Sequence, residues 1–486
     1  MANIISLWTP SLPTISDGFA GCGGSSAGSE AAGAIVQLAM NHNACSLSTH
    51  MHNFPHAEHR IEDIADLDPF APPHPLMSWW SPECKHHSPS RGEKVKDLGQ
   101  PTLWQCGELD GQAEKSRMSM NQVLRWSEAK YDLGVPYQTI FVENVEEVHH
   151  WQGFHSWMKG MLNIGRGYYA HRELHLNSQI FGVPQSRDRV YFVFWPKRNR
   201  APRLDILPRG YCWRCARLVN GIQCWKNPAK QWGKYRQQYT YNCEYCLWEI
   251  TPEYTPASAI IDWSKPARTI GERKKPLKVT TIERVRIGIG RFCGGQHPMP
   301  LLVETCRSHK GGGFSRPVTE PGFTQTTSQS IGVAHTQEAM PFVGNRARSQ
   351  SAGSYTSAIT NPLPTMTTQQ EQGLVLPPQA TAQPFPFFVS YYSNGKPYGV
   401  DQPLCTVSTR DRNGLCLPPE TKSALHDLPS WRFRMLDRYE VQRAMGFDPS
   451  YQVVANSERE AVRQLGLAVT PIVAEYLVRA ALDALS

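Results

Sequence analysis

Five short apolar runs in the first 195 residues constrain the fold more than any other feature of the sequence. They lie at 15–19, 35–39, 76–80, 139–142 and 190–195. Small-residue or helical segments separate them, as in repeated strand–helix–strand units. Such units place their strands in a parallel sheet with helices on both faces. We therefore predict an α/β fold with a doubly wound, Rossmann-like parallel sheet in residues 1–195.

The rest of the chain divides into two parts. Residues 196–430 are basic and rich in proline and glycine, with few helical periodicities, and predict a β- and loop-rich second domain. Residues 431–486 return to a helical pattern, in which Thr470 and Pro471 provide an N-cap and a proline at the first helical position. One apolar face of this helix is formed by Ala474, Leu477, Val478, Ala481 and Leu482. We expect this segment to complete the first domain.

A repeat lies within the second domain, at about 315–415. The pattern P-x-x-T-x-(S/T)-T begins at Pro321, Pro362 and Pro403, with a spacing of 41 residues. A fixed period of this length indicates one supersecondary unit used repeatedly. Two interpretations stay open: a β-hairpin unit that only stacks, and a surface whose hydroxyl groups contact DNA phosphates.

Composition narrows the class of protein. The 486 residues include 50 Lys plus Arg against 42 Asp plus Glu, a net charge of +8 that suits a phosphate-binding surface. Thirteen cysteines without a signal-peptide pattern favour reduced thiols, metal ligation or catalysis over a disulfide framework. No apolar run reaches the ~18 residues of a membrane span. We expect a cytoplasmic protein, as in a bacterial or phage-infected cell, with no membrane contact and no obligate protein partner.

Paired cysteines at about 208–250 are the strongest local signal. Cys212 and Cys215 form one C-x-x-C pair, and Cys243 and Cys246 form another after 27 intervening residues. Two such pairs supply four thiolates for a closed, structural tetrahedral Zn²⁺ site, although Cys224 lies between them and could replace one ligand. Aromatic and basic neighbours suggest a surface that faces DNA: Trp213, Arg214, Arg217, Lys226, Lys230, Lys234 and Arg236.

A glycine-rich turn follows the first apolar run. Residues 17–24 read Asp-Gly-Phe-Ala-Gly-Cys-Gly-Gly and lead into a helical segment. Glycines in such a turn let the backbone approach a nucleotide closely. Taken alone, the segment is equally compatible with a purely structural turn.

Three further segments place reactive groups next to predicted strands. Cys84 follows the run 76–80; the adjacent Lys85, His86 and His87 favour its thiolate, whereas Glu83 opposes it. By itself this cysteine is as compatible with metal binding as with nucleophilic attack. Glu143 ends the run 139–142. Gln185, Arg187 and Arg189 precede the last run, where the arginines could hold a phosphate or a base carbonyl.

Together and in this order, these segments resemble the DNA cytosine-C5 methyltransferase family. The motif D-x-F-x-G-x-G-G matches 17–24, Glu-Asn-Val matches 143–145, and Q-x-R-x-R matches 185–189. Segments 434–447 and 463–469 resemble the family's closing motifs. The resemblance covers about 10–195 and 430–486, so that the residues between correspond to a target-recognition domain. It implies that the doubly wound sheet is of the S-adenosylmethionine-dependent methyltransferase type.

The resemblance also implies the chemistry and the partner. Double-stranded DNA would be the substrate, with a cytosine flipped out of the helix. Cys84 would add to C6 of that cytosine, Glu143 would stabilise the protonated N3, and Arg189, assisted by Arg187, would grip the base or its phosphate. S-adenosyl-L-methionine would supply the methyl group. Its site would be formed by Asp17, Phe19, Gly21, Gly23, Asn41, Asp63 and Leu467.

Two departures from the family pattern keep alternatives open. The usual P-C-Q around the nucleophile reads Glu83-Cys84-Lys85, and Leu467 replaces the usual Asn of the closing motif. A related enzyme that transfers a carboxymethyl group from a carboxylated cofactor is one alternative. An RNA cytosine methyltransferase and a non-catalytic zinc-dependent DNA-binding protein are the others. The motifs do not specify the target sequence, nor whether the role is restriction avoidance or a step in further base modification.

Overall fold

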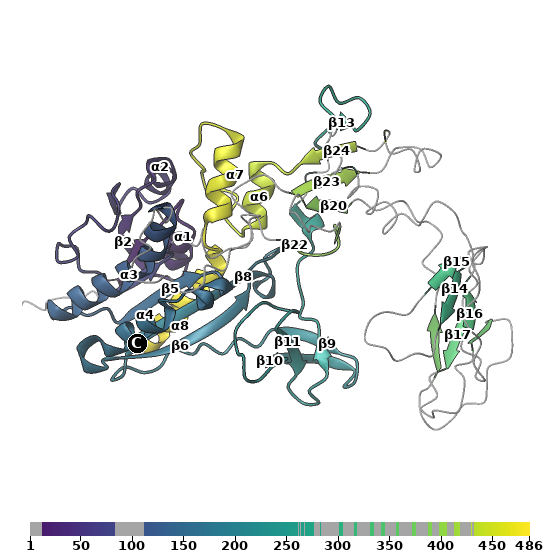
Figure 1. The fold of residues 1–486 in the computed structure, drawn as a ribbon, viewed down its shortest axis with the longest axis horizontal. Helices are drawn as coiled ribbons and strands as arrows, with labels where there is room; N and C mark the ends of the chain where they lie inside the picture. Colours follow the sequence, from purple (N-terminus) through teal and green to yellow (C-terminus); the bar gives the residue numbers. More distant parts are fainter. Residues whose placement is uncertain are drawn as a thin grey trace, which may run out of the picture.

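A seven-stranded sheet forms the centre of the structure, a computed structural model that describes residues 12–82, 111–260 and 432–486 and parts of 261–431 (Figure 1). The strand order is β3-β2-β1-β4-β5-β8-β6. In chain order the strands are β1 Thr14–Gly18, β2 Ile35–Met40, β3 Glu58–Arg60, β4 Met77–Trp80, β5 Thr139–Asn144, β6 Tyr169–Asn177 and β8 Asp188–Pro196. Strands β1 to β5 pair in parallel. The predicted class, α/β with a doubly wound sheet, is confirmed.

Helices cover both faces of the sheet because its central strands are apolar on both sides. Trp79 and Phe141 lie in a hydrophobic cluster with residues of α8, whereas their neighbours Trp80 and Val142 lie in a second cluster with residues of α3 and α4. Successive strand residues point to opposite faces, so a continuous apolar run must be buried twice. The longer helices are α1 Gly24–Ala31, α2 Ala44–Asn53, α3 Gly111–Asp132, α4 Phe154–Asn163, α6 Arg438–Ala444, α7 Glu458–Leu467 and α8 Pro471–Leu485. Short 3-10 turns are η2 Glu146–His150, η3 Ile164–Arg166, η4 Ser178–Phe181 and η5 Ala257–Ile260.

All five predicted strands exist, with ends shifted by one or two residues at most of them. The sheet is parallel from β1 to β5, and β8 runs antiparallel to both β5 and β6. The short connection from β6 to β8 contains only η4, a turn and the two-residue strand β7, whereas a parallel pairing needs a crossover of about a dozen residues or more. Strands β3 and β6 were not predicted because neither forms an apolar run. All three residues of β3 are polar, and β6 mixes polar and apolar residues.

The middle of the chain forms small antiparallel sheets, in agreement with the β- and loop-rich prediction. One four-stranded sheet, hereafter the cysteine ribbon, contains β9 Arg209–Cys212, β10 Arg217–Trp225, β11 Tyr239–Cys243 and β12 Glu249–Ile250. A five-stranded sheet contains β13 Arg268–Thr269, β20 Phe387–Ser390, β21 Tyr398–Gly399, β23 Asn413–Leu417 and β24 Arg432–Met435. A parallel pair joins β22 Leu404–Cys405 to β7 Gln185–Ser186.

The 41-residue spacing recurs in the strands. One three-stranded sheet contains β14 Leu301–Glu304, β15 Ser315–Pro317 and β16 Ile331–Ala334, and the other contains β17 Phe342–Asn345, β18 Thr356–Ala358 and β19 Gln372–Val375. Each strand of the second sheet begins 41 residues after its counterpart, and the pairing order is the same. The segments that begin at Pro321 and Pro362 lie outside the described residues. Whether this unit contacts DNA stays a prediction.

The C-terminal segment returns to the first domain. Thr470 occupies the N-cap position of α8, but its side chain makes no capping hydrogen bond with the described residues. The predicted apolar face packs onto the sheet. The stretch Glu458–Leu485 is the one part of the described chain long and apolar enough to be tested as a membrane span. It consists of the two helices α7 and α8, and most of its apolar window is buried within the protein. A buried core helix passes the same test of length and hydropathy.

Replacement of Gly28 tests the contact between α1 and α8. A Cβ atom at this position would lie 2.1 Å from the carbonyl oxygen of Pro471 and 2.7 Å from Cβ of Ala474. We expect Gly28→Ala to lower the free energy of unfolding by about 1–3 kcal/mol in urea denaturation, because an overpacked contact must shift backbone. Ala31→Ser, at an exposed position of the same helix, should stay within about 0.5 kcal/mol of the wild type. Equal midpoints for Gly28→Ala and wild type would contradict this packing.

Candidate functional site

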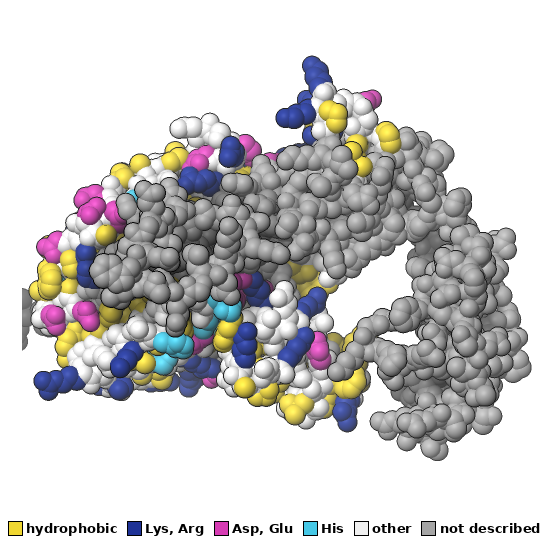
Figure 2. Space-filling model, in the orientation of Figure 1, with side chains coloured by type: hydrophobic (Ala, Val, Ile, Leu, Met, Phe, Trp, Pro, Cys, Tyr) yellow, Lys and Arg dark blue, Asp and Glu magenta, His cyan; other side chains and the backbone are white. Residues whose placement is uncertain are grey.

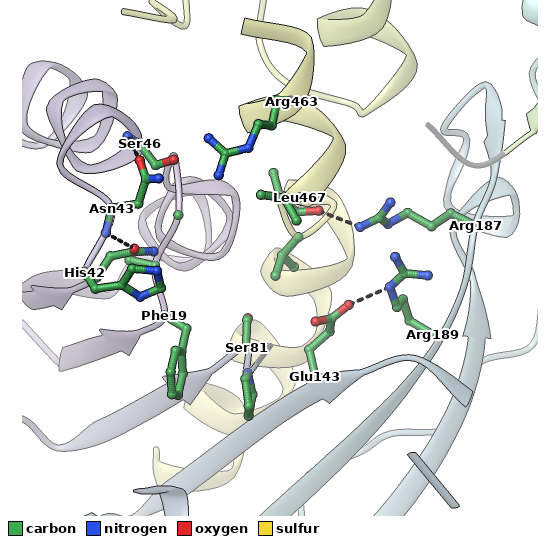
Figure 3. A pocket seen from close by; sticks show the side chains of 16 residues that line it. Phe19, His42, Asn43, Ser46, Ser81, Glu143, Arg187, Arg189, Arg463 and Leu467 are labelled. Atoms are coloured by element: carbon green, nitrogen blue, oxygen red, sulfur yellow. Dashed lines mark hydrogen bonds and ion pairs between the residues drawn. The ribbon is translucent and has the colours of Figure 1, made fainter. Parts of the chain in front are cut away.

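A pocket opens at the carboxyl ends of the parallel strands, the edge at which α/β sheets bind ligands (Figure 3). The turns after β1, β2 and β4, the end of β5, the segment before β8 and the turn after α7 all contribute to it. It is lined by Phe19, Ala20, Gly21, Asn41, His42, Asn43, Ser46, Ser81, Pro82, Glu143, Arg187, Arg189, Arg463, Leu467, Ala468 and Val469. Segments more than 440 residues apart in sequence therefore share one cavity.

The glycine-rich turn forms one wall with a strained backbone. Phe19 has φ 60° and Gly21 has φ 56°, so both adopt the left-handed conformation. For a residue with a Cβ atom this conformation costs about 1–2 kcal/mol, and such strain is concentrated at functional sites. Gly23, with φ 92°, is the N-cap of α1, and a Cβ atom there would lie 2.6 Å from Oη of Tyr451. The turn thus presents to the pocket both the backbone at Gly21 and the aromatic side chain of Phe19 (Figure 3).

Asp17 supports this turn from below and does not line the pocket in the described part of the chain. Its side chain is buried, and its Oδ2 accepts hydrogen bonds of 2.6 Å from the hydroxyl groups of Ser25 and Ser26. Burial raises the pKa of Asp17 from its ordinary value of 3.8 to about 6, although the two serine hydrogen bonds act in the opposite direction. The carboxyl group therefore holds β1 and α1 together at the start of the turn.

The turn after β2 contributes polar groups to the same wall. Oδ1 of Asn41 accepts a 2.8 Å hydrogen bond from the backbone of Asn43, whose own side chain caps α2 through the N–H of Ser46. Of these residues, sequence analysis singled out Asn41 alone. Asp63 is exposed, accepts a hydrogen bond from the N–H of Ala65, and is not among the residues that line the pocket as described. Its predicted place in the cofactor site stays a prediction.

An ion pair occupies the opposite wall. Nε of Arg189 lies 2.8 Å from Oε1 of Glu143, and both side chains are largely buried. Glu143 stands near the carboxyl end of β5, and Arg189 near the start of the antiparallel strand β8, so that sheet pairing brings them together (Figure 3). A second bond from Nη1 of Arg189 to the carbonyl oxygen of Asp188 fixes the guanidinium. The pocket thus contains an oriented carboxylate and a cation at one end.

Arg187 binds protein groups in the pocket wall. Its side chain is 3% exposed, and its NH groups donate to the carbonyl oxygens of Gly466 at 3.3 Å and Ala468 at 3.0 Å. These carbonyls flank Leu467, which is 40% exposed and lines the pocket. Arg187 therefore positions the turn between α7 and α8, a contact that sequence analysis did not foresee. Its predicted assistance to Arg189 in holding a ligand stays a prediction.

The predicted nucleophile cannot be placed. Cys84, Glu83 and Lys85 lie outside the described residues, which resume at 111. The chain just before them, Ser81 and Pro82, lines the pocket. Sequence analysis also missed His42, in the turn after β2, and Ser46, near the start of α2, because neither belongs to a motif. Arg463 of α7 lies in the segment 463–469 but was not singled out as a site residue.

Four cysteines converge at one end of the cysteine ribbon. Sγ of Cys212 lies 3.5 Å from that of Cys246, and Sγ of Cys215 lies 3.8 Å from that of Cys243. All four sulfur atoms lie within 4.8 Å of one another. Sulfur ligands at ~2.3 Å from a tetrahedral Zn²⁺ are about 3.8 Å apart, so these four thiols fit such an ion.

The surface of the cysteine ribbon combines aromatic and basic side chains. Trp213 is 82% exposed, and the guanidinium of Arg217 lies 4.2 Å from the ring centroid of Tyr245. In Figure 2, Lys and Arg side chains alternate with hydrophobic ones over the part of the surface that β9, β10 and β11 occupy in Figure 1. Such a surface is compatible with stacking on bases and pairing with phosphates.

Comparisons with known proteins found similarity only to solved structures. No protein-family model and no curated protein matches the chain. A DNA modification methyltransferase encoded within an E. coli prophage is 13% identical, with a TM-score of 0.41, and 97% of this chain and 99% of that one are covered. A Dnmt2 mutant from Spodoptera frugiperda is 12% identical, with a TM-score of 0.47 and 97% and 99% coverage. The Dnmt2 methyltransferase of S. pombe is 12% identical, with a TM-score of 0.49 and 98% and 99% coverage. Methyltransferases are thus among the structures that this chain resembles, at low identity.

The raised pKa of Asp17 predicts a pH effect on stability. Because the folded protein binds the proton more tightly than the unfolded chain, stability should fall as pH rises from about 4 to about 6, by on the order of 3 kcal/mol. Asp17→Asn removes the titration and keeps an acceptor for Ser25 and Ser26. We measure the free energy of unfolding in urea at a series of pH values. Over this interval, we expect that of Asp17→Asn to increase relative to that of the wild type. Asp63→Asn is the exposed control, and parallel curves for Asp17→Asn and wild type would contradict the assignment.

Proposed function

We propose that this protein is a DNA cytosine-C5 methyltransferase. The observation that carries the proposal is the pocket itself: the ion pair of Glu143 and Arg189 faces the same cavity as the glycine-rich turn and the Ser81–Pro82 segment. Cys84 follows Pro82 by two residues in the sequence. A nucleophile, an acid for a ring nitrogen and a nucleotide-binding turn are the groups that this reaction requires.

Each group has a defined part in the chemistry. The Cys84 thiolate forms a bond to C6 of cytosine, and the electron pair of the C5–C6 double bond becomes available at C5. Glu143 stabilises the proton on N3, which prevents negative charge from accumulating in the ring. Arg189 holds Glu143 in orientation. S-adenosyl-L-methionine, when bound, supplies an electrophilic methyl group for C5. Solvent water then takes the C5 proton, the C5–H electron pair re-forms the C5–C6 double bond, and the C6–S bond breaks to release the Cys84 thiolate.

The pocket has the donors and the space that this cofactor needs. The backbone of Phe19 to Gly21 would lie against it, Asn41 would bond to a hydroxyl group, and Leu467 would contact its aliphatic part. Gly21 adds no side chain to the pocket, and the ring of Phe19 provides an apolar surface beside it, which suits a nucleoside.

The substrate proposal is double-stranded DNA with a flipped cytosine. Extrusion of a base costs a few kcal/mol, and contacts of DNA with the basic aromatic surface of the cysteine ribbon can offset that cost. We assign residues 1–195 and 431–486 to the catalytic domain and 196–430 to target recognition. In the cysteine ribbon, Cys212, Cys215, Cys243 and Cys246 would bind a structural Zn²⁺.

An assay on purified protein tests the reaction and its nucleophile together. We expect duplex DNA incubated with S-adenosylmethionine to yield 5-methylcytosine, identified by mass after digestion to nucleosides. Cys84→Ser should reduce the product by at least about a thousandfold, because a serine hydroxyl is not ionised at neutral pH. RNA of the same sequence is the matched substrate control. Product from RNA alone, a heavier adduct, or equal activity of Cys84→Ser would each overturn the proposal as stated.

Two substitutions test the ion pair. Glu143→Gln keeps the shape but removes the negative charge, and we expect kcat to fall by about 10²–10³-fold. Arg189→Lys keeps the charge but loses the Nε contact to Glu143, and a misplaced carboxylate can cost up to about a hundredfold in kcat. Arg479→Lys, half-exposed on α8 and paired with Glu475, is the control and should leave kcat unchanged. Wild-type kcat in Glu143→Gln would remove Glu143 from the mechanism.

A further inference from the structure

A second group of potential ligands lies outside the pocket, among η2, β6 and the cysteine ribbon. His149 and His175 each place Nε2 2.7 Å from Oε1 of Glu173. The ligand atoms of the three side chains all lie within 4.8 Å of one another. Two imidazole nitrogens and a carboxylate oxygen therefore face a common point. We call these three residues the histidine cluster.

The second nitrogen of each imidazole is already engaged. Nδ1 of His175 lies 2.5 Å from Oε2 of Glu146, and Nδ1 of His149 lies 2.9 Å from the backbone oxygen of the same Glu146. A carbonyl oxygen and an ionised carboxylate can only accept hydrogen bonds, so each Nδ1 carries a proton. The N–H of Gly233 is 3.5 Å from Nδ1 of His175, too far to compete with the carboxylate. In neutral imidazoles both Nε2 atoms then present lone pairs to Glu173.

This arrangement requires a cation. A lone pair at 2.7 Å from a carboxylate oxygen is repelled by it, and both histidines are at least nine-tenths buried, where water screens little. Oε1 of Glu146 is also buried without a hydrogen-bond partner among the described residues, so the cluster holds more acceptors than donors. Either extra protons on both imidazoles or a metal ion must supply the missing positive charge.

We infer that the histidine cluster binds a divalent transition-metal ion of the zinc class, separate from the four-cysteine site. Two imidazoles and one carboxylate are a common donor set for Zn²⁺. Histidines that ligate a metal nearly always donate their other N–H to a carboxylate or a carbonyl, which is the role of Glu146 here. Nitrogen and oxygen ligands at ~2.0–2.1 Å from a tetrahedral ion are about 3.4 Å apart. Each Nε2 now lies 2.7 Å from Oε1 of Glu173, so the side chains open by roughly 0.7 Å to admit the ion.

The ion would join the catalytic sheet to the cysteine ribbon. The ring of Trp232, from the loop between β10 and β11, stacks on His149 with a centroid distance of 4.9 Å and an interplanar angle of 10°. Gln223 of β10 donates a 3.0 Å hydrogen bond to the backbone oxygen of His175. Since η2 follows β5 almost directly, a metal here fixes the chain just beyond Glu143 against the ribbon.

Metal analysis of the full chain tests the inference. We expect the purified wild type to contain about two zinc ions per chain, one from each site. The double variant Cys243→Ser, Cys246→Ser should retain the ion of the histidine cluster, and His149→Gln or Glu173→Gln should lose it while keeping the other. His171→Gln, on the same strand β6 but stacked on Phe194 outside the cluster, is the matched control and should keep both ions.

Cobalt substitution provides a readout that does not depend on the stability of the cysteine variant. Co²⁺ added to metal-free wild type should give thiolate charge-transfer bands from the ribbon and additional weaker d–d bands from the histidine cluster. We expect His149→Gln to remove the weaker bands and leave the thiolate bands. A wild type whose zinc content equals that of His149→Gln and Glu173→Gln, with identical cobalt spectra, would overturn the metal site and leave two buried imidazolium ions balanced by Glu146 and Glu173. None of these outcomes depends on whether the protein methylates DNA.

Discussion

The close contact of the C-terminal segment with the first helix determines how the rest of the molecule is arranged. Gly24 and Gly28 have no side chains, which lets the backbone of Val469 and Pro471 lie directly against α1. That contact places the end of α7, including Leu467, at the pocket. There Arg187 donates hydrogen bonds to the carbonyl oxygens of Gly466 and Ala468. The pocket therefore has a complete wall only when α1 and the segment that joins α7 to α8 are packed together.

Much of the central sheet could be predicted because its strands are buried on two faces. All four residues of Met77–Trp80 are buried, with Ser78 as the one polar residue among them, and few structures other than a central strand tolerate that. The edge strand β3, Glu-His-Arg, and the strand β6, with five polar or charged residues among nine, lack this signal. Their places depend on pairing with β2 and β8, which is a property of the whole sheet. The antiparallel direction of β8 depends likewise on the short connection that precedes it.

Sequence analysis identified the residues of the candidate site that lie at the ends of strands, but it missed several that lie on helices and in turns. Glu143 and Arg189 were identified from their places beside apolar runs, and the ion pair between them agrees with that reasoning. His42, in a turn, and Ser46 and Arg463, on helices, reach the pocket through the packing of α2 and α7 at its rim, which their residue types do not reveal. The histidine cluster was missed for a different reason: its members come from η2 and β6, and Trp232, which covers it, lies more than 50 residues further along the chain.

The strands of the middle region imply that its length is modular. β13 and β20 both belong to one five-stranded sheet, so the chain between them leaves that sheet and comes back to it. The excursion contains two sheets with the same pairing order, offset by 41 residues. Loss or gain of one such unit would join equivalent strands and leave both anchor points in place. Variation in the number of units could thus alter how far the protein reaches without any change at the pocket.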